Sequence, residues 1–306
     1  MQTTIKSPVS FDGCGLHSGR PARMTIRPAS AQHGIWFKRT DIPFGDTLVP
    51  ARWDAVEQSP LCTRIVNRSG VPVSTIEHVM AALAGCGVHN ALIEIDGPEV
   101  PILDGSAAPF VSGILSRGVR ALFEPIYVIE MLETVRVQNA TGWAQLAPSP
   151  VPRMRFHIAF EDAAIGTQDL SLTLANGAFV RELCNSRTFC RKADVDAMHA
   201  QGLALGGTLD NAVVVDGSRV LSPGGLRHAD EAVRHKMLDA LGDLALAGGP
   251  ILGEYTGHKA GHALTNDLLH AVFCTPGAFR MVACDDDLAA RLPGAGVERH
   301  EIPAVA

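Results

Sequence analysis

The segment from Asp230 to Leu244 constrains this chain more than any other part of its sequence. Two acidic residues open it, as suits the first turn of a helix, and Gly248-Gly249-Pro250 follows as a stop signal. Its apolar residues recur at helical spacing, at Val233, Met237, Leu241 and Leu244. A second set, four residues apart beside the small Gly242, is polar and consists of His235, Asp239 and Asp243. We predict an amphipathic helix with a chemically distinctive polar face.

That polar face has two interpretations. A histidine and a carboxylate one helical turn apart can bind the same Zn²⁺ at about 2.0–2.2 Å without distorting the helix. A solvated helix surface gives the same pattern and, for an isolated pair, is the commoner explanation. The choice depends on motifs elsewhere in the chain.

Length and charge restrict the class of protein. A chain of 306 residues suits two domains of about 150 residues each. The net charge of −6 comes without a basic tract, and aromatic residues make up only 5% of the chain. A nucleic-acid groove needs basic side chains and often stacking aromatics, so we expect no nucleic-acid partner and a small-molecule partner instead.

The sequence lacks targeting and cross-linking signals. The first residues have no apolar core of a signal peptide, and no run of about 18 apolar residues occurs. We therefore expect a soluble, cytoplasmic protein with no transmembrane segment. Separately, we expect the chain to be a monomer. Seven cysteines without a Cys-x-x-Cys pair fit reduced, mostly buried thiols better than disulfides or a thiolate zinc site.

Strand and helix patterns run through the chain twice, which predicts two α+β domains of similar plan, 1–123 and 126–306, each with helices on one face of a sheet. The linker is Phe123-Glu124-Pro125. The expected strands are 4–11, 22–27, 35–38, 91–95, 127–138, 143–147, 154–160, 170–174 and 251–255. The expected helices begin near 74 and 106 in the first domain and cover 177–183, 230–246 and 262–273 in the second.

Two segments depart from this plan and are interpreted as insertions. The first, about 40–67, is irregular and rich in proline and polar residues. The second, about 189–217, combines a helix at 193–200, a glycine-rich stretch at 202–207 and an apolar strand at 212–215. We expect the second insertion to have an apolar inner side; an extra lobe with its own minor core is an equal alternative.

Glu77 has a structural and a chemical interpretation. Ser74-Thr75-Ile76-Glu77 matches a capping box, in which the glutamate would bond back to the cap residue. Glu77 also precedes His78, and a carboxylate beside a metal-binding histidine is a frequent arrangement where water needs a base. The local sequence favours the cap and leaves both open.

Six strings occur in order and together carry a resemblance. They are Gly13-Cys14-Gly15-Leu16-His17-Ser18-Gly19, Ser74-Thr75-Ile76-Glu77-His78, Pro101-Ile102-Leu103-Asp104-Gly105-Ser106, Arg187-Thr188-Phe189, Arg234-His235-Lys236-Met237-Leu238-Asp239 and Lys259-Ala260-Gly261-His262-Ala263. From about residue 3 to 275 the chain resembles the UDP-3-O-acyl-N-acetylglucosamine deacetylases, zinc amidases of lipid A biosynthesis. The resemblance implies two similar α+β domains, one insertion in each and an active site between them.

The resemblance also implies an activity and residue roles. The activity is hydrolysis of the N-acetyl group of UDP-3-O-acyl-N-acetylglucosamine to free amine and acetate, the committed step of lipid A biosynthesis. Zn²⁺ would be bound by His78, His235 and Asp239. The catalytic residues would be Glu77 as base, His262 as the cation or acid at the oxyanion or departing amine, Asp243 as the group that orients His262, and Thr188 as a hydroxyl donor to the tetrahedral intermediate.

Substrate contacts follow from the same resemblance. The implied binding residues are Lys236 for phosphate or hydroxyls, Phe189 and Phe160 for the sugar and nucleotide, His17 close to the site, and Leu203 and Ala212 in the second insertion along the acyl-chain path. Asp104 matches a position near the site but suits a helix cap equally well. Gly142 stands where the family often has a lysine, so a phosphate-binding role of that loop is not implied here.

Two other functions remain open. A zinc amidase for another acylated amino sugar would keep the metal residues without needing an acyl path. A noncatalytic binding module with a structural metal would need a fourth protein ligand. Glu77, Thr188 and His262 favour catalysis over the second alternative.

Overall fold

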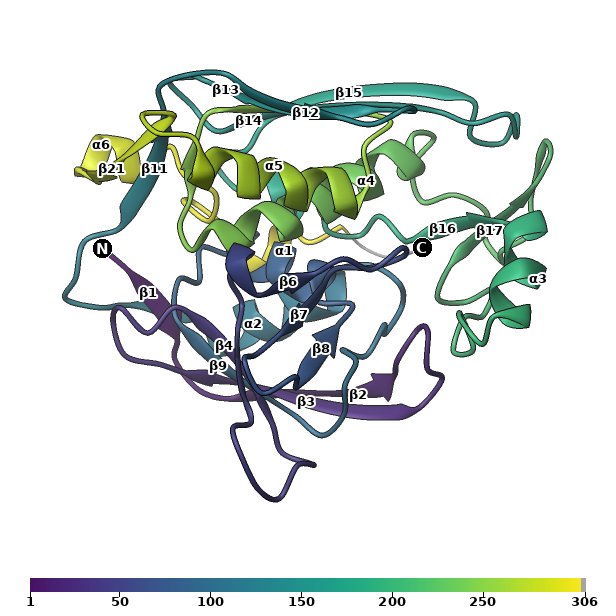
Figure 1. Ribbon diagram of the computed structural model, residues 1–306, viewed down its shortest axis with the longest axis horizontal. Helices are drawn as coiled ribbons and strands as arrows, with labels where there is room; N and C mark the ends of the chain where they lie inside the picture. Colours follow the sequence, from purple (N-terminus) through teal and green to yellow (C-terminus); the bar gives the residue numbers. More distant parts are fainter. Residues whose placement is uncertain (304–306) are drawn as a thin grey trace.

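The computed structural model describes residues 1–303, and its outer layers are two five-stranded sheets with the main helices between them (Figure 1). The first sheet has the order β2-β3-β9-β4-β5. Its strands are β2 (Val9–Cys14), β3 (Pro21–Pro28), β9 (Ala91–Ile95), β4 (Ile35–Arg39) and β5 (Leu48–Pro50). Ala22, Met24 and Ile26, which alternate along β3, are buried, as expected for a sheet with one face against a core.

The second sheet repeats this connectivity, with the order β12-β13-β20-β14-β15. Its strands are β12 (Val135–Gln138), β13 (Trp143–Ala147), β20 (Glu254–His258), β14 (Arg153–Ala159) and β15 (Thr167–Thr173). In each sheet the strand that comes last in the sequence, β9 or β20, lies in the middle of the sheet. It is parallel to one neighbour and antiparallel to the other. The α+β class with two similar sheet-and-helix halves is confirmed.

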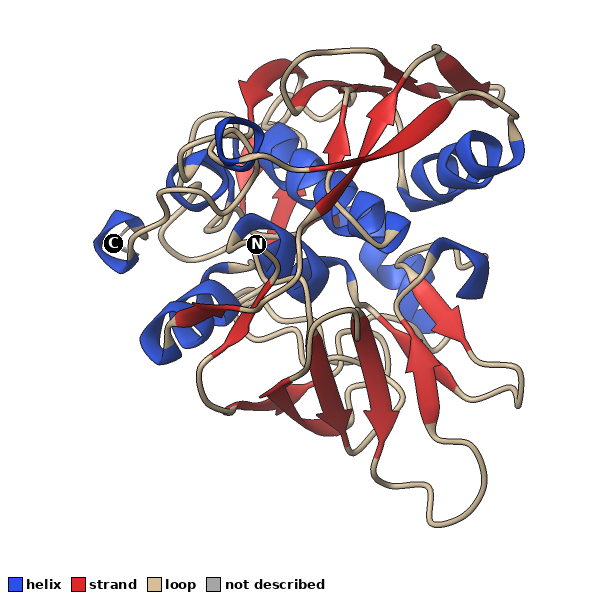
Figure 2. Ribbon diagram, turned by 90° about the vertical axis from the view of Figure 1, so that its left-hand side faces the viewer, coloured by secondary structure: helices blue, strands red, loops and turns tan. Residues whose placement is uncertain are grey.

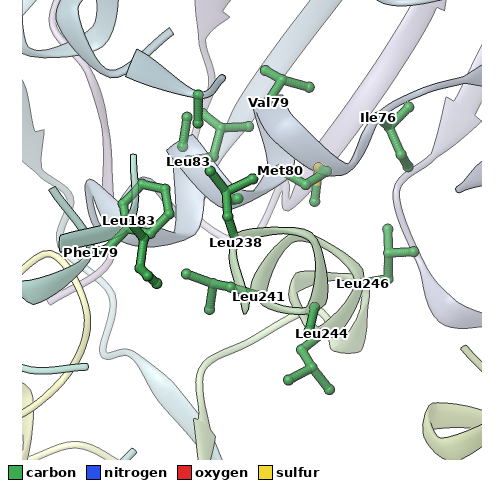
Figure 3. Packing of buried hydrophobic residues seen from close by; sticks show 14 of the residues in the cluster. Ile76, Val79, Met80, Leu83, Phe179, Leu183, Leu238, Leu241, Leu244 and Leu246 are labelled. Atoms are coloured by element: carbon green, nitrogen blue, oxygen red, sulfur yellow. The ribbon is translucent and has the colours of Figure 1, made fainter. Parts of the chain in front are cut away.

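The helices α1 (Glu77–Gly85) and α2 (Ala108–Arg117) cover the first sheet, and α4 (Glu231–Leu244) and α5 (His262–Cys274) cover the second (Figures 1 and 2). Apolar side chains of α1 and α4 interlock at the centre of the molecule (Figure 3). A Cβ on Gly242 of α4 would lie 2.0 Å from the carbonyl oxygen of Glu77 in α1. Glycine at this position therefore lets the two helices approach closely.

Smaller elements complete the two halves. One small sheet contains β6 (Val56–Glu57), β7 (Arg64–Val66) and β8 (Pro72–Ser74), and another contains β16 (Phe189–Arg191), β17 (Val213–Asp216) and β18 (Arg219–Val220). The helix α3 (Lys192–Ala200) lies beside β16 and β17 at the right of Figure 1. The other strands are β1 (Thr3–Ile5), β10 (Val119–Ala121), β11 (Tyr127–Met131), β19 (Ile251–Leu252) and β21 (Phe279–Ala283). The remaining short helices are η1 (Trp53–Ala55), η2 (Phe179–Leu183), η3 (Ala245–Ala247), α6 (Asp286–Ala289) and η4 (Arg299–Glu301).

Three segments that were each predicted as one strand form two strands in the structure, and the two strands belong to different sheets. The segment 4–11 divides into β1 and β2, 127–138 into β11 and β12, and 251–255 into β19 and β20. The first break falls at Ser7-Pro8, where proline lacks an N–H, and the third at Gly253. Apolar alternation continues across such breaks, so the pattern hides them. β21 was not predicted.

The insertions differ in detail from the predictions. Residues 48–50 form β5, the edge of the first main sheet, and the separate small sheet extends to Ser74. In the second insertion α3 has no buried residue, whereas Val213, Val214 and Val215 of β17 are buried. Its apolar side therefore belongs to the strand and not to the helix. The domain limits themselves stay predictions.

All seven cysteines have free thiols, but only Cys62, Cys86 and Cys184 are buried, so the prediction of mostly buried thiols is wrong. Among residues 1–303, no helix is both long and apolar enough to cross a bilayer.

Candidate active site

Three potential metal ligands meet where α1 crosses α4. His78 comes from the first turn of α1, and His235 and Asp239 are one turn apart on α4. One ligand atom from each lies within 4.8 Å of the others. The Oδ1 atom of Asp239 is 3.2 Å from Nε2 of His235 and 3.5 Å from Nε2 of His78. All three side chains are buried, which fits a metal site better than the solvated surface considered from sequence.

The donor atoms suit a cation. The Nδ1 atom of His235 donates to the carbonyl of Ser186 at 3.0 Å, which leaves the lone pair of Nε2 toward the group. Burial lowers the pKa of His235 to about 4, so its ring is neutral and able to coordinate at neutral pH. The buried Oδ1 of Asp239 has no hydrogen-bond partner within the described chain. An unpaired buried carboxylate oxygen beside two imidazole nitrogens fits a divalent metal.

Asp239 is held as a carboxylate. Burial alone would raise the pKa of its side chain, but His235 and Lys236 hold that pKa well below its ordinary value. The ammonium of Lys236 donates to Oδ2 of Asp239 at 3.0 Å. The structure thus places Lys236 against a candidate ligand, and its predicted substrate contact stays a prediction.

A second set of ionisable groups borders the three candidate metal ligands, His78, His235 and Asp239, which we call the metal group. The Nδ1 atom of His262, at the start of α5, donates to Oδ2 of Asp243 at 2.9 Å. Its Nε2 atom lies 3.8 Å from Oε1 of Glu77 and 3.9 Å from Oδ2 of Asp239. The predicted base, acid and orienting carboxylate therefore come together from α1, α4 and α5.

The pKa values of these groups are shifted toward the needs of proton transfer. Burial raises the pKa of Glu77, although His262 and His78 oppose that shift. Burial lowers the pKa of His262, but the charges of Asp243 and Glu77 outweigh it and bring that pKa to about 9. The raised pKa makes Glu77 a stronger base, and His262 is charged and can donate a proton at neutral pH.

The capping-box interpretation of Glu77 is wrong. The helix α1 begins at Glu77 itself, with Ile76 at the cap position and no side-chain cap bond. Ser74 instead donates its hydroxyl to the carbonyl of Pro98, and Thr75 has a positive φ of 57°. Because the chain turns sharply at Thr75, the carboxylate of Glu77 points inward and accepts a hydrogen bond from the amide of Thr63 at 3.1 Å.

Aromatic side chains lie beside the metal group. The rings of Phe189 and His235 are 6.3 Å apart, and Phe160 meets Phe189 edge to face at 5.4 Å. In the second insertion Ala212 is buried and Leu203 is half-buried. The structure thus brings both phenylalanines to the site.

The backbone of Thr188 is held between the two halves of the chain. Its amide donates to Gly105 at 2.8 Å, and its carbonyl accepts from Val213 at 2.8 Å. No side-chain contact of its hydroxyl within residues 1–303 assigns it a role.

His17 approaches the site on a loop of the first half. Glu99 holds this loop, because its carboxylate accepts from the amides of His17 at 2.7 Å and Ser18 at 2.9 Å. Both ring nitrogens of His17 are buried without a hydrogen-bond partner in the described chain. Burial lowers the pKa of His17, with Glu99 opposing the shift and His262 adding to it. A neutral imidazole with two free nitrogens is available to a ligand.

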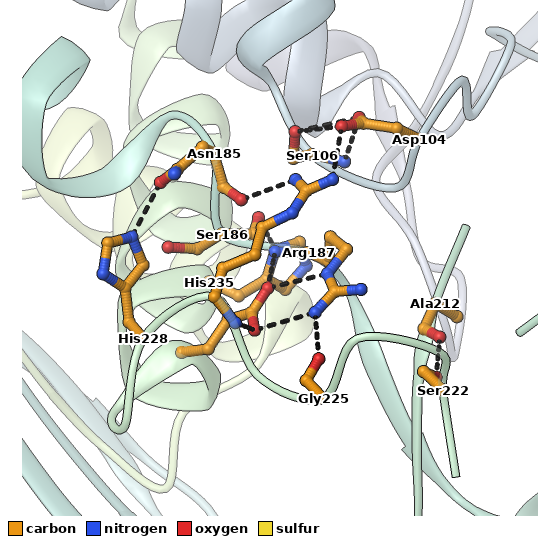
Figure 4. Close-up of polar contacts among 12 residues, drawn as sticks. Asp104, Ser106, Asn185, Ser186, Arg187, Ala212, Ser222, Gly225, His228 and His235 are labelled. Carbon is orange, nitrogen blue, oxygen red and sulfur yellow. Dashed lines mark hydrogen bonds and ion pairs between the residues drawn. The ribbon is translucent and has the colours of Figure 1, made fainter. Parts of the chain in front are cut away.

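Asp104 is not a helix cap, because α2 begins at Ala108 with Ala107 at the cap position. Its carboxylate accepts from Ser106 and pairs with Arg227 at 3.0 Å (Figure 4). Nearby, Arg187 and Glu231 form a buried ion pair at 2.9 Å. The Arg187–Glu231 pair ties the segment just before β16, which includes Thr188, to the first turn of α4.

Gly142 packs against the end of β20. A Cβ there would lie 2.5 Å from the carbonyl oxygen of His258 and 2.6 Å from that of Lys259. A lysine at this position would require the backbone to move.

Sequence reasoning missed Thr63 and Glu99, which hold Glu77 and the His17 loop. Glu99 lies two residues before Pro101, at the start of the Pro101 to Ser106 string, and this closeness was a weak signal. Thr63 lies in an irregular segment with no spacing pattern and gave none.

Comparison with known proteins agrees with this geometry. The family model for UDP-3-O-acyl N-acetylglycosamine deacetylase matches residues 2–274. A protein named UDP-3-O-acyl-N-acetylglucosamine deacetylase from Phenylobacterium zucineum (strain HLK1) is 46% identical over 288 residues, which cover 94% of this chain and 98% of the relative. Proteins of the same name from Pasteurella multocida (strain Pm70) and Shewanella frigidimarina (strain NCIMB 400) are 44% and 42% identical; the alignments cover 93% and 94% of this chain and 94% of each relative. The chain belongs to the UDP-3-O-acyl N-acetylglycosamine deacetylase family.

Proposed function

We propose that this protein hydrolyses the N-acetyl group of UDP-3-O-acyl-N-acetylglucosamine, a step of lipid A biosynthesis, and that Zn²⁺ is its metal. The observation that carries the proposal is the arrangement of two proton-transfer groups around one three-ligand group. Oε1 of Glu77 and Nε2 of His262 lie 3.8 Å apart beside His78, His235 and Asp239. Family membership supplies the substrate.

Three protein ligands leave coordination positions for water and substrate, as in hydrolytic zinc sites. When bound, Zn²⁺ supplies Lewis acidity to the amide oxygen and to the attacking water. Among residues 1–303, the group has three members and no fourth protein ligand of the kind a structural site would need. This supports catalysis over a noncatalytic binding module.

The residues then divide the proton transfers. Oε1 of Glu77 takes a proton from the water as its oxygen attacks the acetyl carbon. As the C–N bond breaks, Nε2 of His262 gives its proton to the amine nitrogen. The acetic acid formed departs as acetate after losing its proton to solvent, and the proton held by Glu77 passes to His262, which restores both groups. Asp243 favours the charged form of His262 and orients its ring, because Oδ2 of Asp243 accepts a hydrogen bond from Nδ1 during both proton transfers. Thr188 is assigned to the oxyanion.

Substrate binding extends from the metal group along the second insertion. Phe189 and Phe160 support the sugar and nucleotide, and Lys236 and His17 reach its polar groups. Leu203 and Ala212 line the path of the 3-O-acyl chain, and the support for this is that Ala212 is buried and Leu203 half-buried in the insertion. A cytoplasmic location and a monomeric state complete the proposal; cell fractionation and sedimentation would test them.

The test combines metal analysis with an acetate-release assay on UDP-3-O-acyl-N-acetylglucosamine. The purified protein should contain about one zinc per chain and release acetate. His235→Ala, His78→Ala and Asp239→Ala should each lose metal and activity together, while far-UV circular dichroism persists because both main sheets remain. A matched control is His157→Ala, which removes a half-buried histidine of the outer sheet that bonds Asp169.

The outcomes separate the alternatives. Full zinc content in His235→Ala would contradict the ligand assignment. Release of acetate from non-acylated and acylated substrates at equal rates would instead favour the amidase for another amino sugar.

A further inference from the structure

Thr63 is a buried residue that contacts two groups of the site at once. It precedes β7 in the small sheet of the first half, and only 1% of its surface is exposed. Its amide donates to Oε2 of Glu77 at 3.1 Å. Its hydroxyl donates to Oδ1 of Asp243 at 2.5 Å. One residue thus bonds the proposed base and the carboxylate that orients the proposed acid.

The direction of the hydroxyl bond is fixed from the other side. The side-chain amide of Asn266, on α5, donates to Oγ1 of Thr63 at 3.2 Å. Because an amide NH₂ can only donate, Oγ1 must accept there and direct its own hydrogen to Asp243. A chain of directed bonds runs from Asn266 through Thr63 to Asp243, where His262 donates to the other carboxylate oxygen.

Thr63 thereby bonds one oxygen of each carboxylate and leaves the other oxygen toward His262. Thr63 occupies Oε2 of Glu77, while Oε1 faces Nε2 of His262. On Asp243, Thr63 occupies Oδ1 and His262 occupies Oδ2. A carboxylate free to rotate about its last torsion would exchange its two oxygens. The bonds of Thr63 prevent that exchange in both residues.

Thr63 also joins the two halves at this point. Glu77 belongs to α1 of the first half, whereas Asp243 and Asn266 belong to α4 and α5 of the second. The sequence separations of 180 and 203 residues mean that no local structure supplies this contact. The relative position of base and acid therefore depends on a residue outside both helices.

We propose that Thr63 is a positioning residue, which sets the reactive oxygen of Glu77 and the orientation of the Asp243–His262 pair. This inference rests on the proposed function for the roles of Glu77 and His262. Thr63 is buried and bonds none of the three candidate metal ligands in the described structure. It therefore acts on turnover, and neither on substrate affinity nor on metal content.

The test compares Thr63→Val, Thr63→Ser and the parent protein, all loaded with zinc. Valine keeps the shape and the backbone amide but removes the hydroxyl, so kcat should fall by roughly 10- to 100-fold, as when a group that orients a reacting residue is lost. KM and zinc content should stay at the parent values. Serine restores the hydroxyl and should restore most of kcat.

A matched control is Thr4→Val. Thr4 is also fully buried and donates its hydroxyl to the carbonyl of Asn90 at 2.7 Å, but it lies in β1, outside the site. Thr4→Val should lose stability comparably and keep kcat. If Thr63→Val does not fold, Asn266→Ala tests the same chain of bonds and should lower kcat with KM unchanged.

Three results would overturn the proposal: a kcat in Thr63→Val equal to that in Thr4→Val, no recovery in Thr63→Ser, or zinc loss in Thr63→Val. A nuclear magnetic resonance signal separates this inference from the proposed function. The Nδ1–H resonance of His262 should broaden in Thr63→Val and persist in Thr63→Ser. An unchanged resonance in Thr63→Val would refute positioning, whereas a parent protein that releases no acetate would refute the proposed function alone.

Discussion

At the scale of single residues, the site depends on a small number of ionisable side chains that lie close together. Potential metal-ligand atoms of His78, His235 and Asp239 lie within 4.8 Å of one another. Glu77 and His262 border this group. Every one of these side chains comes from a helix end or a helix face at the crossing of α1, α4 and α5. Their chemistry could be inferred from type and motif, but their mutual distances could not.

Replacing Glu77 by glutamine tests its role as base. Glutamine has the same shape and can still accept from the amide of Thr63, but its amide cannot take a proton from water. We expect kcat to fall by roughly 10²–10⁴-fold. Urea unfolding should give a nearly unchanged midpoint. A Glu77→Gln protein with near-parent turnover would show that Glu77 is structural.

The pH dependence of turnover tests His262. Its pKa is raised to about 9, so the ring is charged at neutral pH and loses its proton as pH rises through that value. A bound divalent cation would lower this pKa, so the alkaline limb of kcat/KM should lie at or below about pH 9. In His262→Ala that limb should shift or vanish along with most of the rate. An alkaline limb that His262→Ala leaves in place would mean that another group is titrating.

The same shift predicts how the stability of the metal-free protein depends on pH. The folded pKa of His262 lies above the ordinary value of 6.5. Its stabilising contribution is therefore complete below about pH 6.5 and is lost as pH rises toward about 9. Urea unfolding across this window should show a decline that is smaller in His262→Ala. A parallel decline in both proteins would contradict the assignment.

At the scale of elements, α1 and α4 decide the geometry of the site, because each carries groups that must meet. Gly242→Ala would place a Cβ 2.0 Å from the carbonyl oxygen of Glu77. The helices must then separate, and we expect a loss of about 1–3 kcal/mol in unfolding free energy together with a fall in kcat. Gly97→Ala is the control, since its Cβ meets nothing within 4 Å. Parent-like kcat in Gly242→Ala would show that the site tolerates wider spacing.

The second insertion makes a prediction about the acyl chain. Each buried methylene contributes roughly 0.8 kcal/mol, so five along β17 would favour binding by about 4 kcal/mol, close to a thousandfold. Ala212→Phe narrows the path and Leu203→Asp places a charge in it. Both should reduce kcat/KM for the acylated substrate far more than for a non-acylated one, with zinc content unchanged. Equal losses for both substrates would argue against a path along this insertion.

The sequence predicted regular elements well and their connections less well. The strands 91–95 and 143–147 were predicted to the residue, because turn residues bound them on both sides. The predicted capping box does not form because Thr75 takes a positive φ. Glu99 stabilises this conformation, since its carboxylate accepts a hydrogen bond from the hydroxyl of Thr75 at 3.2 Å. A side chain 24 residues away thus overrides a local pattern, and no local pattern records it.

At the scale of the whole molecule, the site is a product of the interface between the two halves. His78 and Glu77 come from the first half, and His235, Asp239, Asp243 and His262 from the second. The sequence motifs shared with the family identified these residues without any knowledge of the interface. Thr63 could not be found in this way, because its importance lies in contacts across 180 and 203 residues of sequence.

The central position of β20 in the second main sheet determines when that sheet can form during synthesis of the chain. The first main sheet can close once residue 95 has left the ribosome, but β13 and β14 lack their common neighbour until residue 258 has followed. At about 5–20 residues per second, the first half waits roughly 10 to 30 s with the apolar face of α1 uncovered. During this interval the nascent chain carries the proposed base, Glu77, and one candidate metal ligand, His78, before their partners on α4 and α5 have been made. We therefore expect chaperones to matter most at this stage.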